Sequence, residues 1–141
     1  MNDEIFVKIV QSWNEFEIAD LYRAGGWWKE EYRSEELPHL IRGSFLFAVA
    51  IEQKTGRAVG MGRIISDGVS DGYIQDLVVL PAFRNLGVGS KIISELVKTG
   101  REKGLTWIAL VAEPGTEEFY QPLGFNKMDG YVPMILKGDG S

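Results

Sequence analysis

A short segment between an apolar run and an amphipathic stretch contains the residues that are the first candidates for a binding or catalytic site. Arg84, Gly87 and Gly89 follow the apolar residues Leu77 to Leu80, and Ser90 to Lys103 then carries apolar residues at helical spacing. A helix N-terminus presents unpaired N–H groups and a partial positive charge, and glycines let the backbone approach an anion closely. The pattern is typical of a loop that binds a phosphate or pyrophosphate, although a plain turn before a helix has the same local pattern.

Two other phosphate-binding motifs fit this loop poorly. A P-loop needs a lysine and a serine or threonine directly after its last glycine, whereas Lys91 lies two residues after Gly89 and is followed by Ile92. A dinucleotide fingerprint needs a third small residue where Ile92 stands, and an N-terminal βαβ unit. A nucleotide-binding protein of another type is therefore disfavoured.

The residue types that are missing narrow the chemistry further. The chain has no cysteine and one histidine, His39, which excludes a thiolate nucleophile, a zinc–thiolate site and a multi-histidine metal site. A Ser-His-Asp triad would depend on His39, and no Gly-x-Ser-x-Gly elbow accompanies it. Catalysis would have to rely on carboxylates, tyrosines, backbone groups or a bound cofactor, and no metal is expected.

Length and charge bound the remaining possibilities. The 141 residues predict one domain over 1–137 and a flexible tail over 138–141. The net charge of -5 argues against a nucleic-acid partner. No apolar run reaches the roughly 20 residues that span a bilayer, and the N-terminus lacks a signal-peptide core. The expected location is therefore the cytoplasm, with no membrane partner.

Apolar periodicity and turn residues predict the order β-α-α-β-β-β-α-β-α-β-β, a mixed α/β (α+β) domain built on one sheet. The predicted strands are Ile5 to Val10, Phe45 to Glu52, Ala58 to Ser66, Tyr73 to Leu80, Thr106 to Ala112, Phe125 to Met128 and Val132 to Leu136. The predicted helices are Asn14 to Ala24 with Asn14 as N-cap, Ser34 to Arg42, Ser90 to Lys103 and Thr116 to Leu123.

Two motifs together resemble a known family. Leu77 to Gly89, LVVLPAFRNLGVG, resembles the acetyl-CoA motif of the GNAT family of N-acetyltransferases. Glu118 to Phe125, EFYQPLGF, is similar to a later motif of that family, and the predicted order of elements also matches. The resemblance implies a single sheet that is mostly antiparallel, with a central parallel pair and flanking helices.

The resemblance also implies where acetyl-CoA, the co-substrate, would bind. The pyrophosphate would lie in the loop, and the amide-rich pantetheine arm would pair with the backbone of the fourth strand, which splays from the fifth near a bulge. The implied donor-site residues are Leu77, Val78 and Val79 in the strand and Arg84, Asn85, Leu86, Gly87, Val88, Gly89 and Ser90 in the loop.

For catalysis, the resemblance implies that Tyr120 is the general acid that protonates the departing thiolate. The general base stays open between Asp76 on the central strand and Glu113 after the fifth strand. Many family members have asparagine where Glu113 stands, so a carried-over pantetheine contact there is in doubt. Because no cysteine is present, direct attack by the amine within a ternary complex is expected.

The resemblance also implies that the region between the first two helices forms one wall of the acceptor site, where Trp27 and Trp28 could pack against a small primary amine. The same tryptophans could instead simply cover the edge of the sheet. Protein N-termini and lysine side chains stay open as acceptors, and a non-catalytic module that senses acyl-CoA is the alternative function. A homodimer through the closing strands is compatible with the family.

Overall fold

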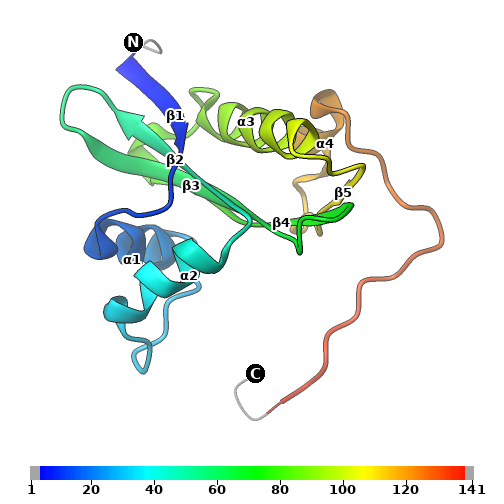
Figure 1. Ribbon diagram of the computed structural model, residues 1–141, viewed down its shortest axis with the longest axis horizontal. Coiled ribbons are helices and arrows are strands. Elements are labelled where there is room, and N and C mark those ends of the chain that lie inside the picture. Colours follow the sequence, from blue (N-terminus) through cyan, green and yellow to red (C-terminus); the bar gives the residue numbers. More distant parts are fainter. Residues whose placement is uncertain (1–3, 139–141) are drawn as a thin grey trace. The chain divides into compact units, whose positions relative to one another are not determined.

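The computed structural model describes residues 4–138, which form two compact units, one ending at Leu110 and the other beginning at Val111. Each unit is described by itself. The elements shown in Figure 1 are β1 (Ile5–Ile9), α1 (Glu15–Ala24), α2 (Leu37–Gly43), β2 (Leu46–Glu52), β3 (Arg57–Ile65), β4 (Asp71–Val79), α3 (Val88–Glu102), β5 (Trp107–Ala109) and α4 (Glu117–Tyr120). The predicted single domain over 1–137 stays a prediction, and residues 139–141 of the predicted tail lie outside the described residues.

All five strands belong to one sheet of the first unit, in the order β1-β2-β3-β4-β5. Neighbouring strands are antiparallel except β4 and β5, which are parallel. This confirms the predicted mixed sheet, mostly antiparallel and flanked by helices. The parallel pair lies at the end of the sheet, not in its centre, because no strand follows β5 in the described part of the chain.

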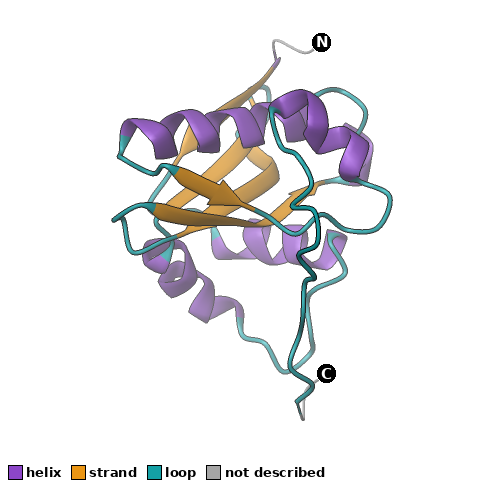
Figure 2. Ribbon diagram, turned by 90° about the vertical axis from the view of Figure 1, so that its right-hand side faces the viewer, coloured by secondary structure: helices purple, strands orange, loops and turns teal. Residues whose placement is uncertain are grey.

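Helices cover both faces of this sheet, with α1 and α2 on one face and α3 on the other (Figures 1 and 2). Phe47, Val49 and Ile51 of β2 belong to a buried cluster with α1 and α2. On the opposite face, a Cβ added at Gly60 would lie 3.0 Å from Cδ1 of Ile92 in α3. The interior strand β2 is buried along almost its whole length because both of its faces are covered.

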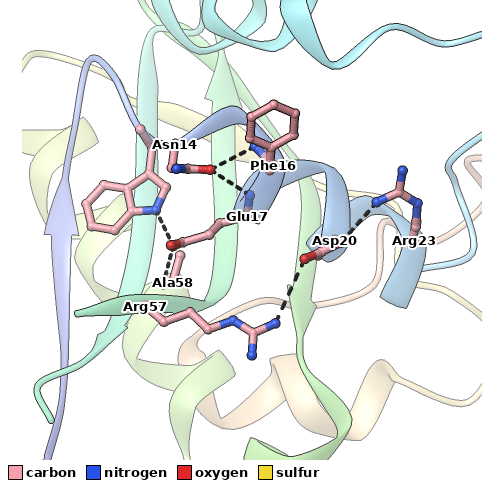
Figure 3. Close-up of polar contacts among 8 residues, drawn as sticks. Asn14, Phe16, Glu17, Asp20, Arg23, Arg57 and Ala58 are labelled. Carbon is pink, nitrogen blue, oxygen red and sulfur yellow. Dashed lines mark hydrogen bonds and ion pairs between the residues drawn. The ribbon is translucent and has the colours of Figure 1, made fainter. Parts of the chain in front are cut away.

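Two side-chain oxygens accept hydrogen bonds at the start of α1, and one of them also joins the helix to the sheet, as Figure 3 shows. As predicted, Asn14 caps the helix, and its Oδ1 accepts hydrogen bonds from the N–H groups of Phe16 at 2.9 Å and Glu17 at 3.1 Å. Oε1 of Glu17 accepts from Nε1 of Trp13 at 2.8 Å and from the N–H of Ala58 in β3 at 2.9 Å. The first turn of α1 is thereby held against β3.

In the second unit, the predicted closing strands Phe125 to Met128 and Val132 to Leu136 are wrong, because residues 125–138 form no strand. Apolar composition suggested strands, but Pro133 cannot donate a ladder hydrogen bond, and a two-stranded hairpin alone is marginally stable. The predicted helix from Thr116 to Leu123 is split into α4 and a 3₁₀ turn, Gln121–Leu123. Pro122 has no N–H with which to continue the α-helical pattern.

The described residues include no helix that is long and apolar enough to cross a membrane.

Candidate functional site

One edge of β4 is left without a strand partner just before the glycine loop. β5 pairs with β4 only at Asp71, Gly72 and Tyr73. From Ile74 to Val79, β4 keeps β3 on one side and has no strand on the other within residues 4–138. An extended, amide-rich ligand can use such an edge as an added strand does.

The same stretch of β4 contains a β-bulge. Met61 of β3 faces Val78 and Arg63 faces Gln75, so Asp76 and Leu77 together oppose a single residue, Gly62. Asp76 has a φ of 64°, which is uncommon for a residue other than glycine, with Asn and Asp the usual exceptions. A bulge bends its strand and redirects the groups beside it. The predicted donor residues Leu77, Val78 and Val79 therefore begin inside or directly after this bulge.

The carboxylate of Asp76 is held by two donors from other elements. The hydroxyl of Tyr22 in α1 and Nε of Arg63 in β3 both donate to Oδ2 of Asp76, each at 2.7 Å. Arg63 also donates from Nη1 to Oγ of Ser44 at 3.4 Å and from Nη2 to Oε1 of Gln75 at 3.3 Å. Burial, together with the charge of Asp76 and the hydrogen bond to it, raises the pKa of Tyr22 well above its ordinary range. Tyr22 is therefore a permanent donor at neutral pH.

The glycine loop leads into α3 with an exposed backbone. Asn85 has a φ of 64° and Gly87 a φ of 79°, both in the left-handed region, and Gly87 is the N-cap residue. No side chain caps this helix, and its first turn has no acidic residue. The buried side chain of Val88 fixes the start of the helix to the core. The N–H groups of the first turn are thus available to an anion, and an uncapped helix start of this kind fits a pyrophosphate.

Arg84 joins this loop to the free edge of β4. Its Nε donates to the carbonyl oxygen of Val79 at 2.9 Å, while the side chain stays exposed. The 3₁₀ turn Pro81–Phe83 lies between these two residues in the chain. The structure therefore brings the predicted strand and loop residues into one continuous backbone surface.

The predicted acceptor residues follow the C-terminal end of α1. The N–H of Trp27 donates to the carbonyl of Tyr22 at 3.0 Å, and the two rings meet edge to face with centroids 6.2 Å apart. Trp28 meets Tyr32 edge to face at 5.6 Å, and the Arg23 guanidinium lies 5.3 Å from the Trp28 ring centroid. Both tryptophans are half-buried and pack against the cluster under α1 and α2, so they cover core as well.

Tyr120 and Glu113 belong to the second unit. The Tyr120 ring packs edge to face against Phe119 at 4.9 Å and Phe125 at 6.1 Å. Burial raises the pKa of Tyr120, and the charge of Glu113 raises it further. Glu113 itself is exposed. The phenol is therefore protonated at neutral pH, as a general acid must be.

Sequence reasoning missed Tyr22 and Arg63 as parts of this site. Arg63 carried a signal, because a lone cation inside the apolar run Ala58 to Ile65 needs a buried partner. Tyr22 carried none, since it occupies an ordinary position on the apolar face of α1. Among residues 4–138, no group of three or more His, Asp or Glu side chains could hold a metal ion.

Known proteins share this fold. The structure of a GNAT-family acetyltransferase from Streptococcus pneumoniae TIGR4 superposes with a TM-score of 0.78 at 26% sequence identity, covering 96% of this chain and 98% of that one. A sequence model described as the Acetyltransferase (GNAT) family matches residues 9–125. The chain belongs to the GNAT family of acetyltransferases.

Named relatives come from several organisms. GCN5-related N-acetyltransferase 1, chloroplastic, of Arabidopsis thaliana is 39% identical over 85 residues, which are 60% of this chain and 43% of that protein. Serotonin N-acetyltransferase 2, chloroplastic, of Oryza sativa subsp. japonica is 43% identical over 70 residues, 50% of this chain and 35% of that protein. Glucosamine 6-phosphate N-acetyltransferase of Trypanosoma brucei brucei is 32% identical over 101 residues, 67% of this chain and 69% of that protein. The chain thus spans less than half the length of both plant relatives.

Proposed function

We propose that this chain is an acetyl-CoA-dependent N-acetyltransferase that acts on a primary amine. The observation that carries the proposal is the continuous backbone surface of the first unit. In it, the unpartnered edge of β4 runs to Val79, Arg84 bonds to the end of that edge, and α3 begins without a side-chain cap. An extended amide arm would match the unpartnered edge of β4, and a pyrophosphate at the end of that arm would match the uncapped start of α3.

In this proposal the donor lies along β4 with its pyrophosphate at the start of α3. The residues that hold it are those from Leu77 to Val79 and from Arg84 to Ser90. The N–H of Leu77 or Val78 polarises the thioester carbonyl, which raises the electrophilicity of the carbonyl carbon. Most of the rate enhancement then comes from holding two reactants together in the right orientation.

The reaction is a direct acyl transfer. The neutral amine attacks the carbonyl carbon, a C–N bond forms, and the C–S bond to coenzyme A breaks. Tyr120 gives its proton to the departing thiolate, and a carboxylate takes the proton that the amine nitrogen loses. The products are an N-acetyl amine and coenzyme A.

Glu113 suits the general-base role better than Asp76 does. Oδ2 of Asp76 already accepts hydrogen bonds from Tyr22 and Arg63. The carboxylate of Glu113 is exposed, and its charge acts on Tyr120, the proposed acid. An acid and a base that influence each other electrostatically are typical of a proton-transfer site.

We propose a small molecule as the acceptor. Two relatives are named for serotonin and for glucosamine 6-phosphate, both small amines, which supports this class. Trp27 and Trp28 at the end of α1 would supply aromatic surface for an apolar amine. Peptides are the alternative class of acceptor, and the assay below distinguishes them from small amines.

The test is a coenzyme A-release assay with acetyl-CoA and a panel of arylalkylamines, amino sugars, polyamines, amino acids and short peptides. Calorimetric titration with coenzyme A runs beside it, and Gly89→Trp, which places an indole in the first turn of α3, is the loop variant. We expect release with one class of small amine, and loss of coenzyme A binding in Gly89→Trp. Binding without release from any acceptor would favour the non-catalytic module. Acetylation of peptides alone would contradict the small-molecule acceptor.

We also propose that the chain works as a homodimer in the cytoplasm. Support for the dimer comes from the segment 131–136, whose apolar side chains are almost fully exposed. Because the two plant relatives are named chloroplastic proteins, the cytoplasmic location stays a prediction.

A further inference from the structure

Asp76, the strained residue of the β4 bulge, is held by side chains of other elements. Asp76 holds a left-handed backbone conformation that its neighbours in a strand do not share. Its carboxylate is secured by Tyr22, which is 54 positions away in the sequence and only 8% exposed. Arg63 approaches the same oxygen from β3. A strained conformation persists only where surrounding contacts determine it, and these two contacts do so here.

Tyr22 also contacts the loop that follows α1. Its carbonyl accepts the N–H of Trp27 and its ring meets the Trp27 ring. The Trp27 ring lies directly over Gly25, where an added Cβ would be 2.6 Å from Cε3 of the indole. The position of Trp27 is therefore set by its contacts with both Tyr22 and Gly25.

We propose that Tyr22 is a positioning residue for acetyl transfer, which holds the β4 bulge at Asp76 and ties it to Trp27. This rests on the proposed function, in which the N–H groups of Leu77 and Val78 face the acyl group. Rotation of the backbone at Asp76 would turn those N–H groups away from the carbonyl oxygen. Because one side chain fixes both places, the acyl group and the acceptor would be brought into register through Tyr22.

The test is Tyr22→Phe, which removes only the hydroxyl, and the matched control is Tyr73→Phe in β4, the strand that contains Asp76. Tyr22→Phe removes a hydrogen bond to a charged group. From the free energy of such a bond, we expect kcat to fall by about 10- to 100-fold. The KM for acetyl-CoA and the Kd for coenzyme A should rise by a smaller factor than kcat falls, because only the strand part of the proposed donor site is loosened and the loop before α3 is untouched. Tyr73→Phe should keep wild-type kcat.

A second measurement needs no turnover. Backbone ¹⁵N relaxation should show order parameters near 0.85 at Leu77 and Val78 in the wild type, falling toward about 0.6 in Tyr22→Phe. The amides from Asn85 to Ser90 should keep their order. If the wild type bound coenzyme A but acetylated no amine, the proposed function would fail, and these order parameters would still decide whether Tyr22 holds the bulge.

If Tyr22→Phe does not fold, Asp76→Asn is the second variant, because asparagine tolerates the left-handed conformation and still offers an acceptor to Tyr22. It should keep the order of Leu77 and Val78, whereas Asp76→Ala should lose it. Unchanged order in Tyr22→Phe, or equal order in Asp76→Asn and Asp76→Ala, would overturn the proposal. So would a loss of coenzyme A affinity equal to the loss of kcat.

Discussion

Nε of Arg84 donates a hydrogen bond to the carbonyl oxygen of Val79 at 2.9 Å, so the glycine loop and the free edge of β4 are held together by one side chain. The rest of the guanidinium is exposed beside the start of α3, where no acidic side chain lies in the first turn. A single arginine thus shapes the turn and supplies positive charge where the pyrophosphate is proposed to bind.

Arg84→Ala should therefore weaken coenzyme A binding by about 10- to 100-fold, the value of a charge-assisted hydrogen bond. Calorimetric titration with coenzyme A measures this, and pantetheine, which lacks the pyrophosphate, should bind both proteins alike. Arg101→Ala, at the other end of α3, is the control and should bind as the wild type does. Equal weakening by both variants would mean that general positive charge, and not the loop, attracts the ligand.

Tyr120→Phe should lower kcat by about 10²- to 10⁴-fold, since no other group would protonate the thiolate. Glu113→Gln removes a negative charge that raises the pKa of Tyr120, so the alkaline limb of the kcat profile should move to lower pH. If Glu113 is also the base, the acid limb should disappear in the same variant. Coenzyme A release measured across pH gives both limbs, and an unmoved alkaline limb would contradict the pairing of these residues.

Local patterns in the sequence were enough to place most of the first unit. The cap at Asn14, the strands up to β4 and the helix after Gly87 each follow from a few adjacent residues, and each lies within two residues of its predicted bounds. The phosphate-loop hypothesis also came from adjacent residues. The left-handed conformation of Gly87 agrees with it, because glycine adopts that conformation without strain.

What the sequence did not reveal depends on contacts between distant residues. The left-handed Asp76 sits in a strand pattern, and its partners Tyr22 and Arg63 come from α1 and β3. Neither partner is adjacent to it in the chain, so no local rule pairs them. Phe125 to Met128 and Val132 to Leu136 were predicted as strands from their local apolar pattern, but a strand needs a partner edge, which a local pattern does not supply.

Gly72→Ala should destabilise the first unit by about 1–3 kcal/mol, as overpacking does. An added Cβ would lie 2.8 Å from Cδ1 of Leu105 and 2.9 Å from Cγ2 of Ile64, so both side chains would have to move. Gly43→Ala is the control, since its Cβ meets nothing within 4 Å at the end of α2, and it should be neutral or stabilising by about 0.4–1 kcal/mol. Urea unfolding measures both, and an equally stable Gly72→Ala would show that Leu105 and Ile64 are loosely packed around Gly72.

Because of Tyr22, the free energy of unfolding should fall at alkaline pH. Its pKa is raised in the folded state, so the unfolded chain loses this proton first, near the ordinary tyrosine pKa of about 10. The stabilisation is fully present below that pH and falls as pH rises, by about 1.4 kcal/mol per pH unit for one proton. The unfolding free energy of the wild type should therefore decline more steeply above about pH 10 than that of Tyr22→Phe. If the unfolding free energies of the two proteins declined equally, the Tyr22 hydroxyl would be exposed to water and not bonded to Asp76.

The segment 131–136 should join two copies of the chain. Met134, Ile135 and Leu136 are 92%, 88% and 91% exposed, which is costly for three consecutive large apolar side chains in water. Ile135→Asp combined with Leu136→Asp should convert a dimer to a monomer, as measured by light scattering after size exclusion. Val69→Asp replaces an exposed apolar residue outside the segment and should leave the dimer intact. A wild type that stays monomeric at high concentration would contradict the dimer and would leave this surface to another protein. The same mass in all three proteins, at twice the monomer value, would place the dimer contact elsewhere in the chain.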